Sequence, residues 1–249
     1  MARQTGLLKI KGTLDNVTFY KSKDGHIAKM KTSVDAARIA NDPAFARTRE
    51  NGKEFGSSAS SGKLLRDSLR NITVNVGGVN NVARITKLMT QIKNMDTTSI
   101  RGQRSVSVGI ANASAKSLLK GFEFNPSAML GSMLYKPFVL APATGVISIT
   151  GLAPSTDLTW PPSATHVSIT GGYANINFTS LVVDFKLTNV VNLANTSIAT
   201  NVSLTPTAVP TGTGTKVFLL KLEYFQLVNG VQYPLKNGAF NALKIIEVA

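Results

Sequence analysis

The second half of the chain consists of short apolar runs separated by Pro, Gly, Asn and Thr. Runs such as GVISITG, SLVVDFKLTNV and TKVFLLKLEYFQLV follow one another at intervals of about 8–15 residues between positions 133 and 249. Alternating apolar residues with turn residues at this spacing are typical of an antiparallel β-sandwich of the immunoglobulin-like kind. Asn229-Gly230 is the strongest hairpin signal, because both residues tolerate the positive φ of a tight turn.

The chain begins with a different β-pattern. The segments LLKIKGTL, NVTFYKS and HIAKMK predict three short strands within residues 6–31, with Asp15-Asn16 and Asp24-Gly25 at the turns. Lysines recur here with a period of two, which predicts that many of them share one solvated face. Two explanations stay open: edge strands carry lysine to prevent aggregation, or the face binds a partner.

Beyond Thr32 the apolar spacing becomes helical. We expect Ser33 to cap a short helix that ends near Ala40, and Asp42 to cap a second helix from Pro43 to about Asn71. The stripe expected to face the core of this second helix consists of Phe45, Phe55, Ala59, Leu65, Leu69 and Ile72. A third, amphipathic helix is predicted over residues 80–95, with Val82 among its inward residues, and a short one within residues 105–121.

The stretch GSSASSGK in the second helix superficially resembles a phosphate-binding loop. A Walker motif has four residues between its first glycine and the Gly-Lys pair, and a Ser or Thr after the lysine holds magnesium. Here five residues separate Gly56 from Gly62, Leu64 replaces the hydroxyl, and no strand precedes. We therefore interpret the stretch as a small-residue helix face that permits a neighbouring backbone to approach closely.

These patterns predict an α+β protein with two domains. Residues 1–121 are expected to form a basic region of a small β-element plus helices, and residues 122–249 an antiparallel β-sandwich.

Positive charge is concentrated in the first part of the chain. Residues 1–104 contain 19 Lys and Arg against 8 Asp and Glu, whereas residues 105–249 contain 8 against 5. Such an asymmetry indicates an anionic partner for the basic part, either nucleic acid or an acidic protein surface.

Catalytic patterns are weak. The chain has no cysteine and only two histidines, His26 and His166, neither within a metal or triad motif. We therefore expect no cofactor, no metal and no enzymatic activity. A glycosidase-like pair of Asp184 and Glu223 is an alternative that the residues leave open, as is ligand binding by the loop at Trp160.

The first residues lack the apolar segment of a secretion signal, and no run reaches the length of a membrane span. We expect synthesis in the cytoplasm without a signal peptide, followed by incorporation into a particle or filament.

The first 70 residues or so contain a specific set of short sequence motifs. Its elements are Gly12, Thr18–Lys21, Asp24-Gly25, Asn41–Phe45, Arg47–Asn51, Glu54-Phe55 and Lys63–Arg66. This pattern resembles the opening of a group of uncharacterised basic proteins from Bacteroidota. The resemblance implies a source among the Bacteroidota and carries no activity with it.

Two functions follow as expectations. The first is a structural protein that self-assembles into a homo-oligomeric filament, tube, shell or phage-like particle through its basic N-terminal region and the edges of its β-sandwich. The alternative is a nucleic-acid-binding protein whose basic half contacts phosphates without sequence preference. The basic residues expected to contact a neighbouring subunit or polyanion are Lys9, Lys11, Lys21, Lys23, Lys29, Lys31, Arg47, Arg49, Lys53, Lys63, Arg66 and Arg70.

Overall fold

A computed structural model of the chain describes residues 2–30, 34–235 and 238–249. The chain forms two compact units, Met1–Asn51 and Gly52–Ala249, which we call the N-terminal and C-terminal units. Helix α2 (Ala46–Ser68) begins in the first unit and continues into the second. Ser33, the predicted first cap, lies outside the described residues.

The N-terminal unit contains a four-stranded antiparallel sheet in the order β1-β4-β3-β2. Its strands are β1 (Ala2–Arg3), β2 (Gly12–Leu14), β3 (Val17–Ser22) and β4 (Gly25–Met30). Strands β3 and β4 match two predicted strands, whereas β2 covers only the last three residues of the predicted strand LLKIKGTL and residues 7–11 form no strand. Strand β1 was not predicted, because two residues carry no periodicity.

Two short helical segments follow this sheet, α1 (Ala36–Asn41) and η1 (Pro43–Phe45). The Asp35 carboxylate accepts a hydrogen bond from the Arg38 N–H at 2.6 Å, and Asp42 accepts one from the Ala44 N–H at 2.9 Å. The cap predicted at Asp42 is confirmed, although the turn that it starts is a 3₁₀ segment.

The helices of the C-terminal unit after α2 are short except for one. They are α3 (Arg70–Thr73), α4 (Asn81–Asn94), α5 (Val106–Gly109), α6 (Ala113–Leu119), α7 (Leu130–Met133) and α8 (Pro154–Asp157). The small-residue face predicted in α2 is confirmed: Ser58, Ser61 and Gly62 are buried, and Gly62 packs against Ile85 and Met89 of α4.

Two antiparallel sheets complete this unit. The larger has the order β11-β10-β7-β8, with β12 also paired to β10, and the smaller has the order β5-β6-β9. The strands are β5 (Val139–Ala141), β6 (Val146–Leu152), β7 (His166–Asn177), β8 (Val182–Ala194), β9 (Thr200–Leu204), β10 (Thr215–Val228), β11 (Val231–Pro234) and β12 (Ala242–Val248). The predicted hairpin is present, since β10 and β11 are joined by Asn229 and Gly230 with φ of 50° and 80°.

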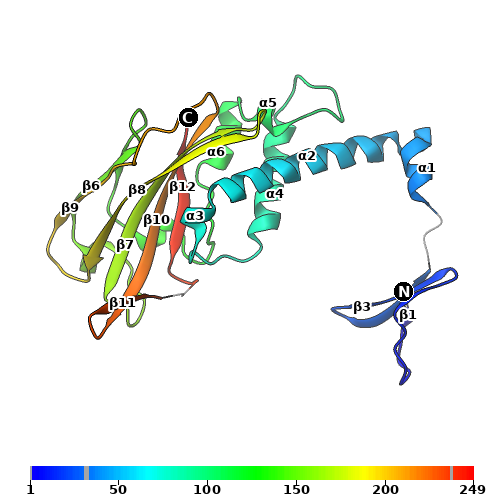
Figure 1. Cartoon of the computed structure of the whole chain (residues 1–249), viewed down its shortest axis with the longest axis horizontal. Helices are drawn as coiled ribbons and strands as arrows, with labels where there is room; N and C mark the ends of the chain where they lie inside the picture. Colours follow the sequence, from blue (N-terminus) through cyan, green and yellow to red (C-terminus); the bar gives the residue numbers. More distant parts are fainter. Residues whose placement is uncertain (1, 31–33, 236–237) are drawn as a thin grey trace. The chain divides into compact units, whose positions relative to one another are not determined.

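The large sheet lies between the helices and the small sheet (Figure 1). Leu219 and Ala174 face the core shared with α2, α4 and α6. Phe218, Leu220 and Tyr173 belong instead to the core formed with β6 and β9. The protein is therefore an α+β protein whose C-terminal part resembles a β-sandwich.

The boundary between the two compact units lies between Asn51 and Gly52, whereas the sequence predicted a boundary between residues 121 and 122. Leu65, Ile85 and Leu119 of the helices share one hydrophobic core with Leu219 and Ile245 of the large sheet. Since neither layer covers its apolar side without the other, helices and sheets form one unit.

Two residues of the predicted helix stripes lie at the surface. Phe55 and Val82 are each 60% exposed. The inward side of α2 at this level is polar, because Glu54 points into the protein and its neighbour Phe55 consequently points out.

Two helical glycines differ in the space around them: Gly109 lies where two helices approach closely, whereas Gly56 faces open space. A Cβ added at Gly109 would lie 2.1 Å from the Ile92 carbonyl oxygen, whereas a Cβ at Gly56 meets nothing within 4 Å. We expect Gly109→Ala to destabilise the protein by about 2 kcal/mol, because α5 can no longer approach α4. Gly56→Ala, the matched control, should raise stability by up to about 1 kcal/mol through its better helix propensity. Urea unfolding measures both changes, and equal effects of the two variants would contradict the packing argument.

Candidate functional site

The predicted basic residues of the N-terminal sheet do not share one face. Lys21 pairs with His26 and Lys29 pairs with Thr18, which is next to Phe19. Because the two-residue turn places odd positions of β3 opposite even positions of β4, Lys21 and Lys29 project to opposite sides. Lys9, Lys11 and Lys23 lie outside the strands and are exposed, whereas Lys31 falls outside the described residues.

Half of the basic side chains predicted on the α2 region have partners within the protein. Arg47 donates to the Glu50 carboxylate at 2.9 Å, and Lys63 pairs with Asp67. Arg49 donates through Nη1 to two backbone carbonyl oxygens, those of Ile39 at 2.8 Å and Asp42 at 2.9 Å. These three cations therefore stabilise their own surroundings.

The remaining three differ in exposure. Lys53 and Arg70 are exposed, whereas Arg66 is half-buried. The Nη1 atom of Arg66 is buried, with no hydrogen-bond partner in the described part of the chain.

A buried charge network joins α2, α4 and the loop before α5. Arg104 donates to both carboxylate oxygens of Glu54, through Nε at 2.8 Å and Nη2 at 2.7 Å. Lys93 Nζ lies 2.5 Å from Glu54 Oε2, and the Gly102 N–H donates to Oε1 at 2.7 Å. Arg104, and to a lesser extent Lys93, hold the pKa of the Glu54 carboxyl far below its usual value.

Asp96 supports the same loop. Burial opposes ionisation of this carboxyl, but hydrogen bonds from the Ser99 and Ser105 N–H groups and from the Thr98 hydroxyl outweigh it and lower its pKa. Both acidic residues are saturated by protein donors, so this network is structural in character.

The N-terminal sheet exposes an apolar face. Leu14, Val17 and Met30 lie opposite one another across three strands, and Phe19 lies opposite Ala28. Leu14 is 67% exposed and Met30 is 68% exposed. This face was not predicted, although Val17 and Phe19 alternate with the polar Thr18.

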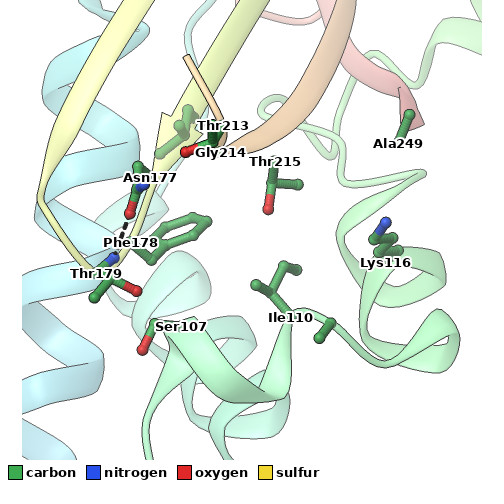
Figure 2. Close-up of a pocket in the computed structure, with 12 residues that line it drawn as sticks. Ser107, Ile110, Lys116, Asn177, Phe178, Thr179, Thr213, Gly214, Thr215 and Ala249 are labelled. Atoms are coloured by element: carbon green, nitrogen blue, oxygen red, sulfur yellow. Dashed lines mark hydrogen bonds between the residues drawn. The ribbon is translucent and has the colours of Figure 1, made fainter.

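A cleft of about 300 Å³ lies between α5, α6 and the adjoining ends of β7 and β10 (Figure 2). Hydroxyl, amide and apolar groups line it together with one ammonium group, that of Lys116. Asn177 Oδ1 accepts a hydrogen bond from the Thr179 N–H at 2.9 Å at its rim. The residues that line this cleft include no Asp, Glu or His.

The structure also places the residues of the two open alternatives, the Asp184 and Glu223 pair and the loop at Trp160. Asp184 and Glu223 project to opposite faces of the large sheet, because Asp184 pairs with Asn175 and Glu223 with Ser168, seven positions apart on β7. Trp160 packs edge-on against Tyr224, with ring centroids 5.4 Å apart, and its indole N–H donates to the Pro154 carbonyl.

Within residues 2–30, 34–235 and 238–249, no group of three or more His, Cys, Asp or Glu side chains is placed to hold a metal ion. In the same ranges no helix is both long enough and apolar enough to cross a membrane.

Comparison of the chain with known protein families, with curated proteins and with solved structures finds no match.

The Glu54 network predicts a distinct pH dependence. The carboxyl has a lowered pKa in the folded protein, so its contribution is complete above the unfolded pKa of about 4.3 and is lost as the pH falls further. Glu54→Gln leaves two cations without their partner, and we expect it to cost about 3–5 kcal/mol at pH 7. This difference from the wild type should shrink below about pH 4.

Urea unfolding at several pH values measures this effect. Asp67→Asn, which removes the partner of Lys63 from the exposed side of the same helix, is the control and should have a much smaller effect. A Glu54→Gln protein as stable as the wild type at pH 7 would rule out a stabilising network.

Proposed function

We propose that the chain is a non-enzymatic structural protein that assembles with copies of itself into a filament, tube, shell or phage-like particle. The observation that carries the proposal is the apolar face of the N-terminal sheet, on which Leu14 and Met30 are exposed and Val17, Phe19 and Ala28 are half-buried. A second copy of the chain is the partner that we propose for this face.

The energetics of the N-terminal unit support this proposal. Among its described residues, Ile27 is the one hydrophobic side chain that is buried. Small sheets need a covered hydrophobic face for stability, and a unit of this size buries little surface by itself. Covering Leu14 and Met30 would contribute about 1.5–3 kcal/mol for each side chain.

The edge of the same sheet offers a second kind of contact. Strand β2 pairs with Val17–Phe19 and ends there, whereas β3 continues to Ser22. Backbone groups at such an edge accept a strand from a neighbouring chain.

We expect the purified protein to elute as a species of many subunits, and the double variant Leu14→Ser/Met30→Ser to elute as a smaller species. The reason is that these substitutions remove apolar area from the proposed contact without touching the C-terminal unit. The matched control is Thr13→Ser/Lys29→Ser on the opposite face of the sheet, which should assemble like the wild type. Size-exclusion chromatography with light scattering measures the mass, and unchanged assembly of the Leu14→Ser/Met30→Ser protein would contradict the proposal.

Binding of nucleic acid is the second candidate function, with an acidic protein surface as the related partner. It is favoured by five exposed lysines that form no ion pair in the described ranges: Lys11, Lys21, Lys23, Lys29 and Lys53. Exposed cations without a protein partner are available for phosphates, and each phosphate contact releases a counterion.

If this second function holds, affinity for duplex DNA should fall linearly with salt on logarithmic axes. Replacing three of the free lysines, Lys21, Lys23 and Lys29, by alanine should reduce the slope by up to about 0.9 per lost contact. The control has the same change of net charge and replaces lysines of the C-terminal unit, namely Lys136, Lys186 and Lys216. Fluorescence anisotropy measures the slope, and equal slopes for both triple variants would exclude the N-terminal lysines as the contact.

A further inference from the structure

We propose that a cleft on the helix-facing side of the large sheet binds one neutral sugar ring, a pyranose. The cleft has a volume of about 250 Å³ and lies between α3 and strands β7, β8 and β10. It is distinct from the N-terminal surface discussed above, and the inference does not depend on assembly.

The cleft exists because the helices cover only part of the sheet. Val217 and Leu219 of β10 belong to the core under the helices. The next residues on the same side of the strand are Lys221 and Glu223, which line the cleft instead. The change from apolar to charged side chains thus coincides with the end of the helical layer.

The two charges of the cleft neutralise each other. Lys221 Nζ lies 2.7 Å from Glu223 Oε2 and also donates to the Val74 carbonyl oxygen at 2.8 Å. Asn75 Nδ2 donates to the other oxygen of Glu223 at 2.9 Å. Lys221 is only 7% exposed, so separating this pair would leave a buried charge unpaired. An ionic ligand would compete with the pair, whereas a neutral ligand leaves it intact.

Uncharged polar groups surround the pair. Ser168 and Thr170 of β7 and Asn71 of α3 line the cleft. Ser168 Oγ accepts a hydrogen bond from Asn192 at 2.9 Å, so its hydroxyl hydrogen is free to donate to a ligand. Hydroxyl, amide and carboxylate groups so close together match a molecule with several adjacent hydroxyl groups.

The rest of the lining is apolar. Ile72, Leu187, Val190 and the ring of Phe225 complete the cleft. A pyranose has this same division, with hydroxyl groups at its edge and C–H groups on its faces. The volume suits a single small ring, since it lies just below the about 300 Å³ at which pockets for drug-sized molecules begin.

A purely structural explanation of the ion pair is that it anchors the chain after α3 to the sheet through Val74 and Asn75. That explanation gives a role to Lys221 and Glu223 but requires no role for the hydroxyl group of Thr170. Thr170→Val therefore separates the two explanations, since it removes one hydroxyl from the cleft and preserves the shape of the side chain and the ion pair.

The test is an NMR titration of the full chain with D-glucose, D-galactose, D-mannose and N-acetylglucosamine, followed at the methyl groups of Ile72, Leu187 and Val190. We expect saturable shifts with at least one of these sugars. Thr170→Val should weaken the affinity about threefold to tenfold, as expected for one lost hydrogen bond. The control Thr150→Val, at an exposed position of β6, should bind like the wild type.

Glucosamine and glucuronate, which carry a charge, are titrated in parallel and should bind more weakly than the neutral sugars. Three results would overturn the proposal: no saturable shift with any of the four neutral sugars, equal affinity of the Thr170→Val and wild-type proteins, or preferential binding of either charged sugar. A Glu223→Gln variant, with unfolding measured separately, should also lose binding, and binding by this variant at wild-type affinity would overturn the proposal as well.

Discussion

The alternation of strand β10 is the constraint on which the C-terminal unit depends. Val217 and Leu219 enter the core beneath the helices, whereas Phe218 and Leu220 enter the core beneath the small sheet. Because side chains of a strand point alternately to opposite faces, one strand supplies both cores and fixes the order of the three layers. The same strand pairs with β7, β11 and β12, so it also joins most strands of the large sheet.

The inward face of α2, where the helix packs against α4, is polar. Gly62 and the buried serines allow α4 to approach closely, but small side chains supply little hydrophobic area. Glu54 compensates at the other end of the contact by binding Arg104, Lys93 and the Gly102 N–H. A bidentate arginine contact adds direction as well as energy. The helix pair is thereby positioned by ionic geometry where apolar packing is thin.

Much of the strand pattern could be predicted from the sequence, since alternation and turn residues act locally. The Asn229-Gly230 hairpin and the cap at Asp42 are of this kind. The partners of Glu54 could not be predicted, because they lie 39 and 50 positions away along the chain. The exposure of Phe55 follows from that unforeseen ion network. The faces of Lys21 and Lys29 were missed because they depend on turn length, which shifts the pairing by one residue.

The two units differ in how completely they bury their apolar side chains. In the C-terminal unit, apolar side chains fill two continuous cores, and the charged pair of Lys221 and Glu223 is satisfied within the fold. In the N-terminal unit, Leu14 and Met30 are exposed on the same face of a small sheet. Hydrophobic area left uncovered in a marginal sheet favours association with any matching surface. The N-terminal unit therefore leaves apolar side chains of its small sheet at the surface, whereas the C-terminal unit encloses two apolar cores of its own.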